Sequence, residues 1–153
     1  RSVMRYLVGI GNYNGLDDSI GLRIVEAIAE AGLDRGFQAI ELGGNLLDLL
    51  HYLGEDTERA LVVDSARMGM APGEHAFFQP DEVATRKGAA GFSTHEGDLL
   101  KVLELGAALG QPLPPVTILG IEPAAIETGF GLSEALAGRM DEYVEAVLGF
   151  FAG

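Results

Sequence analysis

The sequence predicts an α/β fold, a three-layer sandwich in which helices cover both faces of a mostly parallel, twisted sheet of about five strands. Short apolar runs alternate along the chain with segments that have the period of a helix. The strand predicted at residues 59–65, RALVVDS, contains a continuous rather than alternating apolar run, which is typical of a strand buried on both faces of a parallel sheet. With 153 residues and 48% hydrophobic content, the chain is expected to form one domain, residues 1–153, around a sizeable core.

The predicted strands are apolar runs bounded by turn signals. They are residues 4–11, 37–42, 59–65, 75–79, which is an edge strand, and 116–121. The predicted helices lie between them: one whose apolar positions begin at Ile20 and which ends before Gly32, a short leucine-rich helix at 46–53, one that starts at a capping-box sequence at 93–96, and a closing helix at 134–151.

The stretch LVGIGNYNGLDDSIG, between the first strand and the first helix, is glycine-rich like a nucleotide-binding turn. Gly9 and Gly11 fit the first two glycines of G-x-G-x-x-G, but the third position holds Asn14. Asp17 and Asp18 stand at the helix entrance, where two carboxylates would repel a pyrophosphate. This pair suits a cation instead. The alternative is that one acid caps the helix and the other favours its dipole.

Topology is expected to bring Asp18 close to Asp64. In a doubly wound sheet of strand order 2-1-3, the first and third strands are neighbours across the switch point. Asp18 follows the first strand and Asp64 ends the third, so both are expected at the carboxyl ends of adjacent strands. Ligands bind at this edge of such sheets.

His95 is the third candidate for the site. If Ser93 caps the following helix, His95 lies in its first turn, where the helix dipole favours a neutral imidazole that can bind a metal. Asp18, Asp64 and His95 then form a set of two oxygen ligands and one nitrogen ligand that accepts several divalent metals, including nickel. Three alternatives stay open: an exposed His95 at a helix start, a simple acid–base pair of Asp18 and Asp64, and a triad of Ser65 or Ser93 with His95 and an aspartate.

Composition excludes several classes of function. The net charge of −13 disfavours binding to nucleic acid and to anionic membranes, because both need basic patches. No apolar run approaches the roughly 20 residues that a membrane span needs. The chain has no cysteine, so disulfides, thiolate metal sites and a cysteine nucleophile are excluded, in keeping with a cytoplasmic protein.

Four sequence blocks, in order and covering nearly the whole chain, resemble those of the nickel–iron hydrogenase maturation endopeptidases. The blocks are GIGNYNGLDDSIGLRIVEAI, LVVDSARMGMAPGE, FSTHEGDLLKVLEL and TILGIEPAAIETGFGLSEAL. The resemblance implies a monomeric aspartic-type protease that clips a C-terminal extension from the hydrogenase large-subunit precursor after nickel insertion. The family's metal-contacting residues match Asp18, Asp64 and His95 here.

Two positions depart from the family pattern. Asp18 stands where some relatives have glutamate, and Leu42 stands where relatives often have aspartate before the glycine pair. The loss of an acid at 42 weakens a purely aspartic mechanism, so a non-catalytic metal-sensing chaperone on the same fold is the alternative, and a nucleotide-binding domain is a weaker one. Three ligands without a thiolate would hold nickel loosely. The nickel is therefore expected to arrive bound to the precursor.

Overall fold

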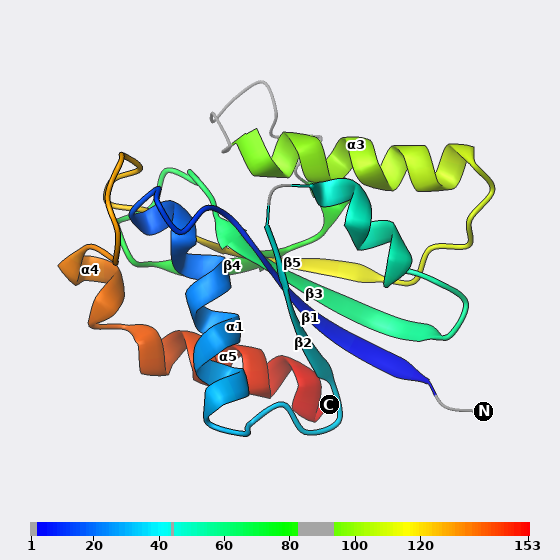
Figure 1. Ribbon diagram of the computed structural model, residues 1–153, viewed down its shortest axis with the longest axis horizontal. Coiled ribbons are helices and arrows are strands. Elements are labelled where there is room, and N and C mark those ends of the chain that lie inside the picture. The colour runs from blue at the N-terminus through cyan, green and yellow to red at the C-terminus, as the bar shows by residue number, and fades with distance from the viewer. Residues whose placement is uncertain (1–2, 44, 83–93) are drawn as a thin grey trace.

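The computed structural model describes residues 3–43, 45–82 and 94–153, except for the side chains of residues 94–97. Its centre is a five-stranded sheet of order β2-β1-β3-β5-β4 (Figure 1). The strands are β1 (Met4–Ile10), β2 (Gln38–Leu42), β3 (Thr57–Ser65), β4 (His75–Phe78) and β5 (Val116–Ile121). Four strands are parallel and β4 pairs antiparallel with β5 at one edge. The predicted α/β fold and the 2-1-3 order around β1 are confirmed.

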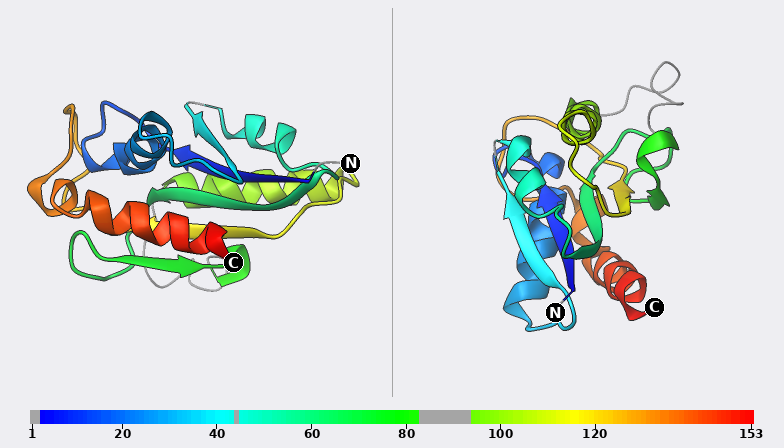
Figure 2. Two further views of the ribbon diagram at one scale, coloured as in Figure 1. Left: turned by 90° about the horizontal axis from the view of Figure 1, so that it is seen from below. Right: turned by 90° about the vertical axis from the view of Figure 1, so that its right-hand side faces the viewer.

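Helices cover both faces of the sheet (Figure 2). On one face lie α1 (Ile20–Glu30) and α5 (Met140–Ala152), and on the other lie α3 (Thr94–Ala108) and the 3-10 helix η2 (Leu46–His51). None of the helices in the described part of the chain is long and apolar enough to cross a bilayer.

Strand β3 shows why its apolar run is continuous. Leu61 and Val63 pack against α1 and α5, whereas Ala60 and Val62 pack against α3 and η2. Successive side chains of a strand point to opposite faces, so a strand covered on both faces needs apolar residues at every position.

Helix α1 lies unusually close to the sheet. A Cβ atom at Gly21 would overlap the carbonyl oxygen of Val63 and lie 2.7 Å from that of Ile10, and one at Gly9 would overlap the carbonyl oxygen of Gly21. The backbones of α1, β1 and β3 are thus in direct contact. This contact fixes the turn between β1 and α1 relative to the end of β3.

Two local predictions are wrong. The closing helix predicted at 134–151 is two helices, α4 (Glu134–Ala137) and α5, because Gly138 ends the first and Arg139 (φ −113°, ψ 12°) leaves the helical region. Neither Asp17 nor Asp18 caps a helix through its side chain: both lie in the 3-10 turn η1 (Asp17–Ser19), and Ser19 occupies the N-cap of α1. The capping box at 93–96 lies outside the residues whose side chains are described.

Candidate active site

Asp18 and Asp64 lie together at the carboxyl ends of β1 and β3. The Ser65 hydroxyl donates to Asp18 Oδ1 at 3.1 Å, and the Ser65 backbone N–H donates to Asp64 Oδ1 at 2.8 Å. Both carboxylates are buried, with 7% and 1% of Asp18 and Asp64 exposed. The structure therefore brings together two of the three predicted site residues, and Ser65 joins them.

His95 lies in the first turn of α3, but its side chain is outside the described part of the structure. Among the described side chains, no group of three or more His, Asp or Glu residues is placed to hold a metal ion. The chemistry of the pair nevertheless fits a divalent cation, since carboxylate oxygens are hard ligands, provided that further ligands come from elsewhere. The catalytic and metal-binding roles of Asp18, Asp64 and His95 stay predictions.

Asp17 makes contacts that the sequence did not reveal. Its side chain is fully buried, and its carboxylate accepts hydrogen bonds from the segment that follows β5. The donors to Oδ2 are the Ala124 N–H at 2.8 Å, the Ala125 N–H at 3.2 Å and the Ser133 hydroxyl at 2.8 Å, and the Ser133 N–H donates to Oδ1 at 2.8 Å. Asp17 thus links the β1–α1 turn to residues 124–133.

The turn that carries Asp17 and Asp18 is strained. Leu16 has φ 55° and ψ −114°, and among the residues that the structure describes it is the only non-glycine residue with positive φ. These angles belong to the first central position of a type II′ turn, which favours glycine, and the Asp18 N–H closes the turn onto the Gly15 carbonyl at 3.1 Å. Such a conformation costs on the order of 1–3 kcal/mol and persists only where the surroundings impose it.

Glu122 anchors the other side of the site. Its carboxylate is buried and accepts hydrogen bonds from the backbone N–H groups of Met68 at 2.7 Å and Met70 at 3.1 Å. These residues lie within five positions after Ser65, so Glu122 holds the segment that leaves the end of β3. The sequence indicated no role for it, because its partners are more than 50 residues away.

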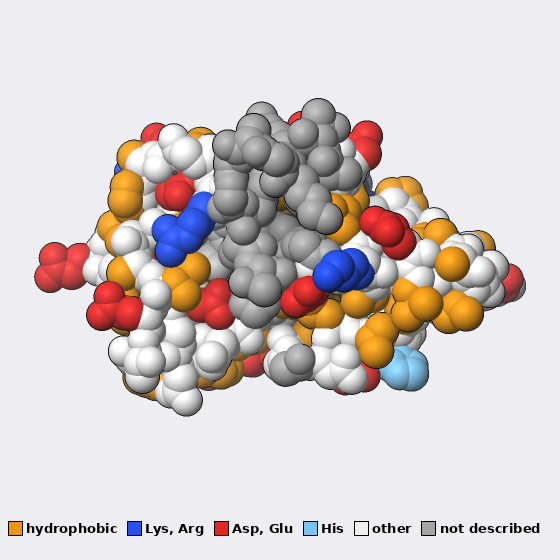
Figure 3. Space-filling model, turned by 90° about the horizontal axis from the view of Figure 1, so that it is seen from above, with side chains coloured by type: hydrophobic (Ala, Val, Ile, Leu, Met, Phe, Trp, Pro, Cys, Tyr) orange, Lys and Arg blue, Asp and Glu red, His pale blue; other side chains and the backbone are white. Residues whose placement is uncertain are grey.

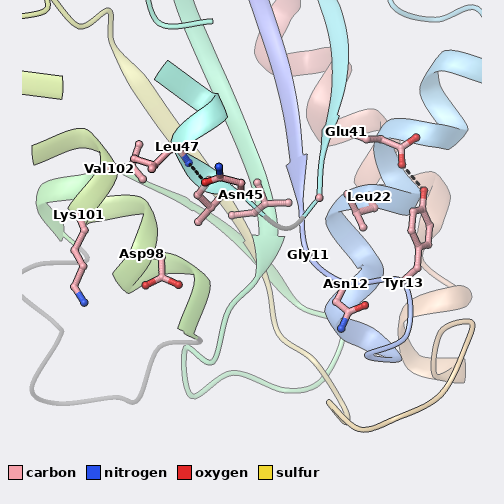
Figure 4. A pocket seen from close by; sticks show the side chains of 13 residues that line it. Gly11, Asn12, Tyr13, Leu22, Glu41, Asn45, Leu47, Asp98, Lys101 and Val102 are labelled. Atoms are coloured by element: carbon pink, nitrogen blue, oxygen red, sulfur yellow. Dashed lines mark hydrogen bonds between the residues drawn. The ribbon is translucent and has the colours of Figure 1, made fainter. Parts of the chain in front are cut away.

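A cavity of about 750 Å³ opens beside the turn that carries Asp18, between the α1 and α3 sides of the molecule (Figure 4). Its wall includes Gly11 and Asn12, and the Asn12 N–H donates to the backbone carbonyl of Asp18 at 3.3 Å. The cavity therefore adjoins the turn that carries Asp18, although neither aspartate lines it. The remaining lining residues are Ile10, Tyr13, Leu22, Glu41, Gly43, Asn45, Leu46, Leu47, Asp98, Lys101 and Val102.

The cavity has an apolar floor and a polar rim. On one side of the rim the Tyr13 hydroxyl donates a hydrogen bond to the Glu41 carboxylate (Figure 4). Burial, and then the hydrogen bond and charge of Glu41 and the charge of Glu26, raise the pKa of Tyr13 above its usual range. Tyr13 therefore remains a hydrogen-bond donor at physiological pH. On the face covered by α3, acidic and apolar side chains are scattered, and the described basic side chains form no continuous patch (Figure 3).

Comparison with known proteins agrees with this geometry. The sequence model of the hydrogenase maturation protease family matches residues 22–150. The chain is 31% identical over 137 residues to the hydrogenase expression/formation protein HupD of Rhodobacter capsulatus, which covers 88% of this chain and 65% of HupD. It is 29% identical over 157 residues to the hydrogenase 2 maturation protease of Escherichia coli, with coverage of 95% and 89%. The chain thus spans about two thirds of the length of HupD.

Solved structures share the fold. The hydrogenase maturating endopeptidase HybD from Escherichia coli has a TM-score of 0.80 at 22% identity, over 98% of this chain and 93% of HybD. The [NiFe] hydrogenase maturation protease HybD from Thermococcus kodakarensis has a TM-score of 0.80 at 23% identity, over 97% and 99%. Because the family model covers most of the chain, the resemblance found in the sequence is confirmed. The chain belongs to the hydrogenase maturation protease family.

Proposed function

We propose that this chain is an endopeptidase that removes the C-terminal extension of a nickel–iron hydrogenase large-subunit precursor after nickel has been inserted. The observation that carries the proposal is the pair of buried carboxylates, Asp18 and Asp64, joined through Ser65 at the switch point of the sheet. In a member of a protease family, this is a place where acid–base groups and metal ligands act on a bound peptide.

In this proposal the nickel belongs to the substrate. Asp18, Asp64 and His95 touch the metal ion that the precursor already holds, and this contact places the extension next to the two carboxylates. A site with two oxygen ligands and one nitrogen ligand is too open to store nickel, but it is suited to completing the shell of a metal held mainly by another protein. Asp18 and Asp64 then serve as the acid–base pair of the hydrolysis.

The cavity beside Asp18 is the natural place for the extension itself. It adjoins the turn through Gly11 and Asn12, and its apolar floor and polar rim fit an extended peptide with mixed side chains. We also propose that the protein works as a monomer, because the whole candidate site comes from one chain, and in the cytoplasm, in keeping with its lack of cysteine.

A non-catalytic metal-sensing chaperone is the second candidate. Leu42, which stands where relatives often have aspartate, is buried in the core and offers no acid to the site. Its neighbour Glu41 faces the cavity but is hydrogen-bonded to Tyr13. If the family's reaction needs an acid at position 42, this chain would bind the nickel-loaded precursor without cutting it.

The two candidates are separated by incubating the purified protein with a nickel-loaded precursor and measuring the intact masses of the products. Endopeptidase activity yields a shortened large subunit and a free C-terminal peptide. The Asp64→Asn variant, which keeps the shape of the side chain, should yield neither. Stable binding of the precursor with no change in its mass would contradict the protease proposal and support the chaperone.

A further inference from the structure

We propose that Asp17 is a positioning residue, which holds the β1–α1 turn in the one conformation that presents the Asp18 carboxylate to Ser65 and Asp64. The activity part of this inference rests on the proposed function, whereas its structural part does not. The two adjacent acids would then have separate tasks, one holding the turn and the other facing the site.

The contacts of the two side chains point in different directions. All four hydrogen bonds described for the Asp17 side chain come from residues 124–133, whereas the Asp18 side chain accepts a hydrogen bond from Ser65 at the end of β3. Asp17 is fully buried, so no water replaces these donors. Its carboxylate ties the turn to a segment more than 100 residues away in sequence.

The turn needs such a tie because of Leu16. A leucine at φ 55° returns to negative φ unless its surroundings prevent it, and the bonds of Asp17, the next residue, oppose that change. The backbone adds three bonds to the same segment: from the Leu16 N–H to the Gly129 carbonyl at 2.9 Å, from the Asp17 N–H to the Ala125 carbonyl at 3.3 Å, and from the Gly129 N–H to the Asn14 carbonyl at 2.9 Å. The whole turn therefore rests on residues 124–133.

Asp18 moves with the turn because its backbone is closely surrounded. A Cβ atom at Gly11 would overlap the Asp18 carbonyl oxygen, and one at Gly15 would lie 2.7 Å from the Asp18 Cβ. The Asp18 main chain thus sits against two glycines with no spare room. A change in the turn at Leu16 displaces the Asp18 carboxylate rather than being absorbed by the neighbouring backbone.

The sharpest perturbation is Asp17→Asn. An asparagine has one acceptor oxygen and one donor nitrogen, so with its oxygen placed at the three Oδ2 donors its nitrogen would face the Ser133 N–H, which lies 2.8 Å from Oδ1. We expect the variant to fold and its kcat for precursor cleavage to fall by about 10–100-fold, because misplacing a reacting group by about 1 Å has effects of this size. KM should rise as well, because in the proposed function the displaced Asp18 also contacts the metal that the precursor carries.

A control separates positioning from general loss of stability. Val147→Ala truncates a fully buried side chain of α5, away from the aspartates, and lowers stability without touching the turn. After correction for the folded fraction, its kcat should equal the wild-type value. Ser133→Ala removes one of the four donors to Asp17 and should lower kcat in the same direction but less, which keeps the test valid if Asp17→Asn does not fold.

Hydrogen exchange measured by mass spectrometry gives a readout that does not need activity. Amides at residues 15–19 should exchange faster in Asp17→Asn, or in Ser133→Ala if the first variant does not fold, but not in Val147→Ala. Exchange at residues 15–19 that is unchanged in Asp17→Asn, or a kcat of Asp17→Asn equal to that of Val147→Ala, would overturn the inference. If the wild-type chain cleaves no precursor, the proposed function fails, and the exchange measurement still decides whether Asp17 holds the turn.

Discussion

Substitution of Gly21 by alanine should destabilise the protein although it improves helix propensity. Gly21 lies in the first turn of α1, where the helix touches the sheet backbone. The added Cβ would overlap the Val63 carbonyl oxygen and lie 2.7 Å from the Ile10 carbonyl oxygen. Both neighbours are main-chain atoms of central strands, so they cannot rotate away as a side chain would.

The size of the effect follows from these contacts. Ordinary carbon–oxygen contacts lie at about 3.3 Å or more, and the Val63 carbonyl oxygen is the closer of the two, so α1 would have to move off the sheet by roughly 1 Å. A gap of that size forfeits about half of the dispersion energy between the two layers, and overpacking typically costs about 1–3 kcal/mol. Alanine gains about 1 kcal/mol over glycine in a helix. With two backbone overlaps the cost lies at the upper end of that range, so we expect a net loss of about 2 kcal/mol.

Gly149 supplies the matched control. It also lies inside a helix, α5, but a Cβ there would have no heavy atom within 4 Å. Gly149→Ala should therefore stabilise the protein by up to about 1 kcal/mol. Urea unfolding of both variants followed by circular dichroism measures the two free energies. A Gly21→Ala variant as stable as Gly149→Ala would refute the account of how α1 packs on the sheet.

Three further substitutions probe the core, the site and a buried tyrosine. Val62→Ala should lower the free energy of unfolding by roughly 1–3 kcal/mol, because the Val62 side chain is fully buried on the face of β3 that α3 covers. Asp64→Asn should abolish processing but leave the fold intact. If Asp64→Asn unfolds the protein and Val62→Ala does not, Asp64 rather than Val62 is the residue that the core depends on. Burial, and then the charge of Glu142, raise the pKa of Tyr143 from 10.0 to about 12. The folded state thus holds this proton more tightly than the unfolded state. The contribution of Tyr143 to the free energy of unfolding is therefore fully present below about pH 10 and is lost as the pH rises through about 12. Tyr143→Phe, which also loses the hydrogen bond to the Gly73 carbonyl, should remove that part of the alkaline fall in urea titrations; an unchanged fall would assign it to other groups.

Periodicity and topology rules predicted most of the fold and the approach of Asp18 to Asp64, but not the roles of Asp17 and Glu122. Apolar runs located the strands, and the 2-1-3 order placed Asp18 beside Asp64 from residues 46 positions apart. The different hydrogen-bond partners of Asp17 and Asp18 could not be predicted, because two adjacent aspartates give the same sequence signal and their partners lie far away in the chain. The same reason hid Glu122, whose carboxylate binds backbone N–H groups that any sequence supplies.

The break between α4 and α5 was missed for a different reason. The apolar stripe from Leu136 to Phe151 continues across it, so the pattern alone favours one helix, and Gly138 was the sole warning. Glycine inside a helix costs only about 1 kcal/mol, which neighbouring contacts can offset in either direction.

The central claim is that the Asp18–Asp64 site acts on a precursor that already carries nickel. The most direct test cleaves a nickel-free and a nickel-loaded precursor side by side, with no metal added to the protease, and follows both by intact mass. We predict that only the nickel-loaded precursor loses its extension, and that adding nickel to the protease does not replace nickel in the substrate. Equal rates for the two precursors would contradict the claim.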